Sequence, residues 1–408
     1  MGQFFLIALA TFASEAAAWL GKSFPHSVFF APALLLLGPA IGYRRLRIPW
    51  HARRRALGWL RRKTRWEFWP PRFAYIPLMP YILYLGIKHR SFTLFTAANP
   101  GIPSGGFVGE SKSAILARLA SVPEFTLLSG CLPIDTRFWA VKAFLAVCEL
   151  SYPVVLKPDV GERGTGVAIA RDDRDVRSYL ETTTADTIVQ KYVGGLEFGV
   201  FYYRYPGQPQ GHIFSITEKR FPEVTGDGRS TLTDLVLRDD RAVCLANQYL
   251  AGLRDRIPAA GERVRLVEVG SHCRGTVFLN GAALETEALR GAVDSIAQSH
   301  PGFFFGRFDI RAATVADLQS GRFDVLELNG VSAEATHMYD PSVSLLEAYR
   351  IMFRQWKIAF EIGALNRQAG EKPMRFREFL DLVRNRPGVN TEPSGLGISG
   401  TVVPFAGR

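Results

Sequence analysis

Two carboxylates and an amide lie close together in the sequence, and these groups can hold a hard metal ion. Asp309 lies in the alternating run 305–313, and Glu327 and Asn329 lie in the next such run, 323–329. Residues i and i+2 of a strand project from one face, so Glu327 and Asn329 project together. Asp309 joins them if the two runs pair as strands. Such a set of oxygen ligands suits Mg²⁺ that bridges phosphate groups.

Arg307 stands two residues before Asp309 and therefore shares its strand face. A guanidinium in that place could stabilise the charge that develops on a transferred phosphoryl group. The alternative for Arg307 and the acidic residues alike is an ordinary strand pair with one polar, solvent-facing side. The pattern by itself leaves both interpretations open.

A lysine followed by a glycine-rich loop forms the second cluster, in the stretch 156–170. Lys157 stands at the end of an apolar run, where its ammonium could meet an anion. Glycines allow backbone N–H groups to approach anionic oxygens closely, so the loop could cover phosphates. The loop residues in question are Gly161, Gly164, Thr165 and Gly166. A glycine-rich hairpin without any ligand is the alternative.

The third cluster is a strand end with the sequence Gln190-Lys191-Tyr192-Val193, followed by Glu197. The backbone of Gln190, Lys191 and Val193 could offer N–H and C=O groups to the edge of a nucleobase. Glu197 could accept hydrogen bonds from ribose hydroxyls. A plain strand, turn and strand would give the same pattern.

Alternating and helical segments must position these groups. Apolar alternation predicts strands, and a 3.6-residue period with capping residues predicts helices. The predicted strands are 152–158, 167–170, 186–193, 197–205, 305–313 and 323–329, and the predicted helices are 137–149, 172–181, 284–299 and 342–365. The stretch 92–120 predicts a strand, a glycine-rich loop and a helix. Helices on strands of mixed order indicate an α+β or α/β body.

The first 90 residues differ from this body. Residues 4–20, 27–42 and 73–87 are apolar, and each is shorter than the roughly 20 residues that a spanning helix needs. A basic run from Arg44 to Arg65 contains ten Lys/Arg and no Asp/Glu. One interpretation is membrane attachment, with the arginines and the tryptophans among them beside anionic lipid. The alternative is a helical region that packs on the body or on another subunit.

Bulk composition excludes several classes of protein. The net charge of 408 residues is +11, but the basic run accounts for all except about +1 of it. The body is therefore not a basic nucleic-acid binder, and no nucleic-acid partner is expected. The four cysteines form no CxxC pair, so reduced thiols are expected rather than a disulfide framework or a thiolate zinc site.

Taken together, the three clusters resemble the ATP-grasp superfamily in order and spacing over about residues 130–365. Lys157 precedes Gln190 by 33 residues, and the trio of Asp309, Glu327 and Asn329 comes last. D-alanine–D-alanine ligases are similar at the glycine loop, the strand end and the trio. The stretches 216–236 and 268–276 are similar to an insertion and a substrate-facing strand of cyanophycin synthetases.

The resemblance implies a fold class, cofactors and roles. The fold is α+β, with two lobes that clasp ATP, and a hydrophobic and basic N-terminal extension. The implied cofactors are ATP and Mg²⁺. In this assignment the phosphates are held by Lys157 and the loop 161–166, and Lys219 reaches the γ-phosphate. Adenine is framed by Gln190, Lys191 and Val193, and ribose is bound by Glu197. Magnesium is held by Asp309, Glu327 and Asn329, Arg307 stabilises acyl-phosphate formation, and Arg274 binds a substrate carboxylate. Many relatives carry glutamate where Gln190 stands, and glutamine still offers an acceptor and a donor.

The segment 95–113 is also similar to an uncharacterised group of bacterial ATP-grasp proteins. Asn99, Glu110 and Lys112 are candidates to line the pocket of the first substrate, and a purely structural loop is the alternative. The expected domains are 1–90 (membrane-associated region), 91–150 (N-terminal substrate subdomain), 151–370 (ATP-grasp domain) and 371–408 (C-terminal helix and loose tail).

The expected function is an ATP- and Mg-dependent carboxylate–amine ligase that acts through an acyl phosphate on small-molecule substrates. A kinase on the same scaffold and a non-catalytic, nucleotide-binding membrane adaptor are the alternatives. Contact of residues 1–88 with a membrane surface would place the protein at the cytoplasmic face of the bacterial inner membrane, peripheral or hairpin-anchored, with the catalytic body in the cytosol.

Overall fold

The computed structural model describes residues 48–385 except 162–163, 253–254, 269 and 271–273. The apolar stretches 4–20 and 27–42, the tail beyond 385 and Cys273 therefore lie outside the described residues. The helices are α3 (Trp50–Thr64), α4 (Pro71–Ala74), α5 (Met79–Lys88), α6 (Lys112–Arg118), α7 (Phe138–Val147), α8 (Asp173–Thr182), α9 (Leu232–Arg238), α10 (Ala246–Gly252), α11 (Glu287–Ser299), α12 (Val315–Gln319), α13 (Leu345–Gln368) and α14 (Phe376–Arg384).

The strands form three sheets, and every strand pair in them is antiparallel. The large sheet has the order β11-β10-β5-β6-β9, the second has the order β1-β4-β2-β3, and β7 pairs with β8. The strands are β1 (Ser129–Leu132), β2 (Val154–Pro158), β3 (Ala168–Ala170), β4 (Thr187–Lys191), β5 (Leu196–Tyr203), β6 (His212–Arg220), β7 (Glu223–Thr225), β8 (Arg263–Arg265), β9 (Val277–Asn280), β10 (Phe305–Ala312) and β11 (Asp324–Asn329).

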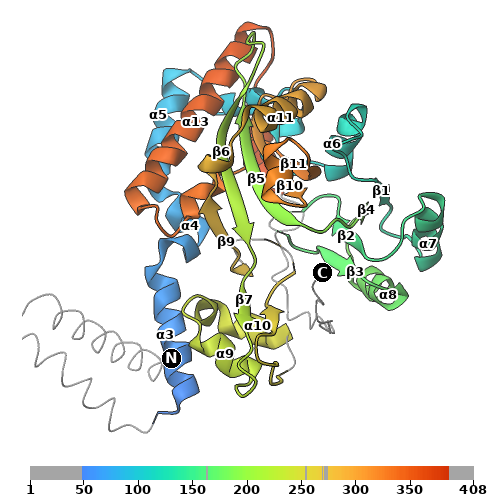
Figure 1. Ribbon diagram of the computed structural model, residues 1–408. Coiled ribbons are helices and arrows are strands. Elements are labelled where there is room, and N and C mark those ends of the chain that lie inside the picture. Colours follow the sequence, from blue (N-terminus) through green and yellow to red (C-terminus); the bar gives the residue numbers. More distant parts are fainter. Residues whose placement is uncertain (1–47, 162–163, 253–254, 269, 271–273, 386–408) are drawn as a thin grey trace, which may run out of the picture.

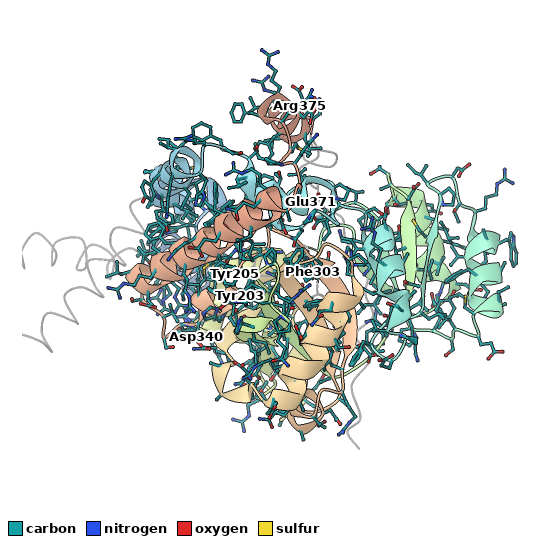
Figure 2. The ribbon with its side chains drawn as sticks, turned by 90° about the horizontal axis from the view of Figure 1, so that it is seen from above. Tyr203, Tyr205, Phe303, Asp340, Glu371 and Arg375 are labelled. Carbon is teal, nitrogen blue, oxygen red and sulfur yellow. The ribbon has the colours of Figure 1, made fainter. Side chains whose placement is uncertain are left out.

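The large sheet has two unlike faces because its strands alternate. On β5, Phe198 and Val200 belong to a buried core that includes Leu289 and Val293 of α11. The opposite face carries aromatic residues at one end, such as Phe201, which pack with α13. Figure 2 shows Tyr203 and Tyr205 at this end, beside α13. The other end of that face is polar, and the candidate site lies there.

The second sheet forms a smaller lobe with α7 and α8, at the right of Figure 1. Val154 and Leu156 of β2 pack with Val141 of α7 and Val176 of α8. The alternate residues of β2 project from the other face of this sheet. Lys157 is one of them, and its side chain reaches β11 of the large sheet.

A third lobe holds β7, β8, α9 and α10, below the large sheet in Figure 1. The N-terminal helix α3 packs on it through Ala56, Leu57 and Gly58. A Cβ on Gly58 would lie 2.1 Å from the Val243 carbonyl oxygen, so only glycine permits this approach. Three arginines of α3 bond to the same lobe: Arg54 to Leu237 O, Arg55 to Asn247 Oδ1 and Arg61 to Asp240 Oδ1. For α3, therefore, packing on the body is what the structure shows.

Most of the predicted elements are present within a few residues of their predicted bounds. Two predictions were wrong. The predicted strand after residue 92 is instead the 3₁₀ helix Leu94–Ala98, whose five residues are all buried, so they cannot alternate between two environments. The substrate-facing strand expected at 268–276 falls partly on residues 269 and 271–273, outside the described residues; at the described positions it is not a strand, since Arg274 is 3₁₀-helical and β9 begins at Val277.

Candidate active site

The acidic trio is assembled by the pairing of β10 with β11. Asp309 lies directly opposite Glu327, and Arg307 lies opposite Asn329. On the other side of β10, Asp309 faces Gly199 of β5. A Cβ on Gly199 would lie 3.2 Å from Cδ of Arg307 and 3.5 Å from Oδ1 of Asp309. Glycine therefore leaves room for the side chains of Arg307 and Asp309 to lie over β5.

Asp309 is buried between two cations. Nε of Arg307 donates to Oδ1 of Asp309 at 2.9 Å, and Nζ of Lys219 lies 3.1 Å from the same oxygen. Burial by itself would raise the pKa of Asp309, but Arg307 and Lys219 outweigh it and lower the pKa to about 2. Asp309 is thus a carboxylate at any neutral pH. Arg307 also donates to the backbone oxygen of Glu334 at 2.9 Å, which fixes its guanidinium.

Glu197 is a second buried carboxylate between cations. Its Oε1 accepts from Nζ of Lys219 at 3.0 Å, and its Oε2 accepts from Arg311 at 2.9 Å. Arg311 also donates to the carbonyl oxygen of Val193 at 2.6 Å. Lys219 therefore bridges Glu197 and Asp309, and Arg311 ties Glu197 to the chain segment that follows β4.

Lys157 lies between the two sheets. Its Nζ donates to Oε1 of Gln190 on β4 at 2.9 Å and to the carbonyl oxygen of Leu326 on β11 at 3.1 Å. Burial lowers the pKa of Lys157, because the charged form loses its hydration. An anion that entered beside Lys157 would restore a partner for that charge.

The glycine-rich loop is held from two sides by basic residues. Lys112, at the start of α6, donates to the carbonyl oxygen of Gly161 at 2.5 Å and lies 3.5 Å from Oε1 of Glu327. Arg274 donates to the carbonyl oxygen of Gly164 at 3.2 Å. Lys112 therefore connects the loop to the acidic trio. Gly164 and Gly166 both have positive φ, which favours glycine.

The cluster is rich in cations. Five cationic side chains and three carboxylates form its connected ion pairs and hydrogen bonds, on or beside the polar face of the large sheet. They are Lys112, Lys157, Lys219, Arg307 and Arg311, with Glu197, Asp309 and Glu327. Asp159 and Glu334 add negative charge near Lys157 and Arg307. The density of cationic donors on this face suits an anionic ligand such as a nucleotide phosphate chain.

Sequence comparison identifies the lobe that contributes Lys157 and Gln190. Residues 134–197 match the family model of the RimK-like ATP-grasp domain. This segment of the chain is similar to an ATP-grasp domain. The matched segment runs from α7 through β2, the glycine loop and β4 to the start of β5, so the predicted α+β ATP-grasp fold is confirmed.

Comparison with solved structures found low-identity relatives. D-alanine–D-alanine ligase from Bacillus anthracis is 17% identical over 66% of this chain and 71% of that chain, with a TM-score of 0.38. L-amino acid ligase from Bacillus licheniformis is 15% identical over 65% and 50%, with a TM-score of 0.35. A bifunctional glutathione synthetase from Pasteurella multocida is 15% identical over 62% and 38%, with a TM-score of 0.34. No curated protein matched the chain.

The predicted nucleotide-edge residues lie at the end of β4 in the ATP-grasp lobe. The N–H of Lys191 already donates to the carbonyl oxygen of Leu128 at 2.9 Å. The Nε2 amide of Gln190 is buried and has no hydrogen-bond partner in the described part of the chain. Gln190 therefore holds Lys157 with its oxygen, and its nitrogen remains available to a ligand.

The candidate site brings most of the predicted residues together, and several of them have partners within the protein. Glu197, predicted to bind ribose, has both oxygens engaged by Lys219 and Arg311. Arg274, predicted to hold a substrate carboxylate, contacts the glycine loop. The roles of these residues toward ligands stay predictions.

The N-terminal loop candidates divide into two kinds. Asn99 is fully buried, and its side chain donates to the carbonyl oxygens of Gly105 and Phe305 and accepts from the N–H groups of Phe304 and Phe305. It is a structural bridge. Lys112, in contrast, reaches Glu327 as described above.

The loop that carries Glu110 packs on the chain just after Asn329. A Cβ on Gly106 would lie 2.6 Å from Cα of Gly330 and 2.8 Å from Oε2 of Glu110. This close approach sets Glu110 beside the C-terminal end of β11.

Sequence reasoning missed Arg311. It stands two residues after Asp309 on β10, as Arg307 stands two residues before it. The alternation that selected Arg307 therefore also places Arg311 on the polar face. Its partners, Glu197 and the Val193 carbonyl, come from more than 100 residues earlier, and such a contact has no local signal.

The trio has the oxygen ligands that Mg²⁺ prefers, and Asp309 would exchange a bond from Arg307, which donates to both of its oxygens in this structure, for the metal. The described residues contain no group of three or more His, Cys, Asp and Glu side chains that could hold a metal ion. The candidate ligands are instead two carboxylates and an amide. The Nδ2 atom of Asn329 is buried without a partner among the described residues, so turning the amide would present its oxygen at no loss. Two or three protein oxygens with further positions for phosphate and water are typical of Mg²⁺ sites.

Proposed function

We propose that the chain is an ATP- and Mg²⁺-dependent ligase that joins a small carboxylate to an amine. One observation carries the proposal: the ATP-grasp lobe places Lys157 against β11, within a cationic cluster that includes the registered pair Asp309 and Glu327. The ligase structures named above share low overall similarity and add no argument of their own. The substrates themselves are part of the proposal.

Each residue has a role that follows from its position. Asp309, Glu327 and Asn329 would hold Mg²⁺, which would supply charge neutralisation for the β- and γ-phosphates. Lys157 and Lys219 would bind phosphate oxygens. Fixed cations lower the barrier because they are already oriented when charge develops. No side chain need bond covalently to the substrate.

The proposed reaction has two steps. A substrate carboxylate oxygen attacks the γ-phosphorus of ATP, the bond to the bridging oxygen breaks, and ADP leaves. Arg307, fixed by Asp309 and the Glu334 backbone, would stabilise the negative charge that gathers at the reacting centre. An amine then attacks the acyl carbon of the acyl phosphate, loses a proton, and releases inorganic phosphate with formation of an amide.

Hydroxylamine tests this proposal without knowledge of the natural amine. The purified chain would be incubated with ATP, Mg²⁺, hydroxylamine and pools of carboxylic acids. The expected result is an acyl hydroxamate, with ADP and phosphate in equal amounts, from a restricted set of acids.

Other outcomes separate the alternatives. Without hydroxylamine, an acyl phosphate that accumulates beyond the amount of enzyme would make the chain a carboxylate kinase. ADP with a phosphorylated hydroxyl compound and no hydroxamate would make it a kinase of hydroxyl groups. No ATP consumption with any acid, together with nucleotide binding, would favour the non-catalytic adaptor.

A further inference from the structure

The helix α5 is apolar on the side that faces solvent as well as on the side that faces the core. Only one of its ten residues, Lys88, is charged. Leu78 and Leu85, before and within it, are buried against α13 and its surroundings. A surface helix normally carries polar residues opposite its buried stripe, and a helix that is apolar all round is normally covered.

The exposed side forms a continuous stripe, which we call the α5 ridge: Ile76, Met79, Leu83 and Ile87. Their exposed fractions are 58%, 44%, 55% and 68%. Met79, Leu83 and Ile87 are spaced four residues apart and share one face of α5, and Ile76 lies in the 3₁₀ helix Ile76–Leu78 just before it. Nearby Phe92 and Phe376 are also about half exposed, with ring centroids 6.4 Å apart, and they extend the apolar surface to α14. Figure 1 shows α5 on the outside of the molecule, beside α13.

The segment that carries the ridge has charged residues of one sign only, whereas the neighbouring helices α13 and α14 also carry Glu361, Glu378 and Asp381. No Asp or Glu occurs between Glu67 and Glu110, whereas Arg72, Lys88 and Arg90 do. Both Lys88 and Arg90, at the C-terminal end of the ridge, are exposed. Apolar side chains flanked by Lys and Arg are typical of surfaces that bind anionic bilayers.

The ridge is suited to lying on a bilayer rather than crossing it. Among the described residues, no helix is both long enough and apolar enough to span a membrane. The ten residues of α5 extend over about 15 Å, and one of its faces is already buried in the protein.

We propose that the α5 ridge docks the protein on the surface of an anionic lipid bilayer. The sequence favours this occupant over the chain's own N-terminal part. Residues 1–43 carry only two charged side chains, Glu15 and Lys22, and include two apolar stretches that themselves need an apolar phase. One bilayer accommodates those stretches and the ridge together. The cytoplasmic leaflet of a cell membrane carries anionic lipid.

Vesicle co-sedimentation of the full chain tests this proposal. The vesicles contain phosphatidylcholine alone or phosphatidylcholine with phosphatidylglycerol. The ridge variant is Leu83→Asp with Ile87→Asp. Its matched control is Trp139→Asp with Val147→Asp on α7, where both side chains are also exposed. We expect wild type and control to bind the anionic vesicles alike, with weaker binding in high salt, and the ridge variant to bind about tenfold or more weakly.

A lipid with a photoactivatable acyl chain gives a second readout that does not depend on the N-terminal stretches. Peptides from residues 73–92 should carry lipid adducts in the wild type and lose them in the ridge variant. Thermal unfolding verifies that the ridge variant is folded. Because neither readout uses ATP or substrate, failure here is separate from failure of the proposed function.

Three results would overturn the proposal. The first is equal vesicle binding by wild type and the ridge variant, with no adducts in 73–92. The second is adducts confined to residues 1–47, which would mean that the ridge is covered by the chain itself. The third is a dimer in solution that the ridge variant dissociates without any effect of lipid, which would make the ridge an interface between two copies.

Discussion

At the scale of single residues, the site is a chain of ion pairs in which no partner can be removed cheaply. Lys219 bridges Glu197 and Asp309, Arg307 holds Asp309, and Arg311 holds Glu197. A buried charge that loses its partner keeps its desolvation cost, which is larger than the gain from the pair. Changes at these positions therefore affect both stability and ligand binding.

Loss of one carboxylate of the registered pair should abolish turnover. Asp309→Asn or Glu327→Gln would remove a metal ligand while keeping shape, so ATP consumption in the hydroxylamine assay should fall by at least about 100-fold. Asp324→Asn, on the same strand β11 but away from the pair, is the control and should stay close to wild type. Near-normal turnover in Glu327→Gln would show that Glu327 is not a magnesium ligand.

Arg311 offers a test of a residue that acts through others. Arg311→Met would leave Glu197 with one cation and the Val193 carbonyl without its donor. The free energy of unfolding should fall by about 1–3 kcal/mol, and the KM for ATP should rise more than kcat falls. The control is Arg290→Met, which breaks an exposed pair with Glu285 and should change stability by less than about 1 kcal/mol. Urea unfolding and steady-state kinetics measure both effects, and equal results for the two variants would contradict the role of Arg311.

At the scale of elements, the alternation of apolar and polar residues predicted the strands and the faces of their side chains. It did not predict structure that depends on contacts between distant segments. The register of β10 and β11 brings Asp309 opposite Glu327. This agrees with the prediction from the alternation of residues along the two strands. The run Leu94–Ala98 is wholly buried among α13 and its neighbours, and no periodicity foretells a 3₁₀ helix there.

The arginines of α3 illustrate the same limit. Their density alone suggested lipid, yet Arg54 and Arg61 bond to a lobe that lies about 180 residues later in the chain. The sequence alone does not distinguish these arginines, which bond to the protein, from Lys88, which is exposed at the end of the α5 ridge. Only the folded structure shows this difference.

The packing of α3 predicts that one Gly→Ala substitution inside a helix will lower the stability of the protein instead of raising it. Gly→Ala inside a helix normally stabilises by about 1 kcal/mol. At Gly58 the new methyl would meet the Val243 carbonyl oxygen, so Gly58→Ala should instead destabilise by about 1–3 kcal/mol.

Gly291 in α11 is the matched control, because a Cβ there meets nothing within 4 Å. Gly291→Ala should raise the free energy of unfolding by up to about 1 kcal/mol. Urea unfolding compares the two variants. Stabilisation by Gly58→Ala would mean that α3 does not press on the third lobe as described.

At the scale of the whole molecule, buried histidines make the free energy of unfolding depend on pH in the mildly acidic range. Burial lowers the pKa of both His300 and His337 below the usual value of 6.5. Nε2 of His300 and Nδ1 of His337 are buried and find no partner in the described ranges. Below pH 6.5 the unfolded chain therefore binds more protons than the folded chain, and stability must decrease as pH falls.

The pH dependence can be separated from that of the acidic residues. Asp309, with a pKa of about 2 in the folded state, loses its contribution only below about pH 4. Urea midpoints should therefore fall between about pH 7 and pH 5, and His300→Gln with His337→Gln should flatten this fall. His212→Gln, at an exposed position, should leave it unchanged. A double variant with the full pH dependence would show that other groups cause it.

Calorimetric titration with a non-hydrolysable ATP analogue, with and without Mg²⁺, tests most directly whether the cluster between the two sheets is a Mg-ATP site. A Mg-ATP site should bind the analogue in the wild type, at least tenfold more weakly when Mg²⁺ is chelated, and Glu327→Gln should bind weakly with or without Mg²⁺. Lys157→Met should lose binding. If a folded wild type does not bind, or if binding is the same in all these conditions and variants, the cluster is not a Mg-ATP site.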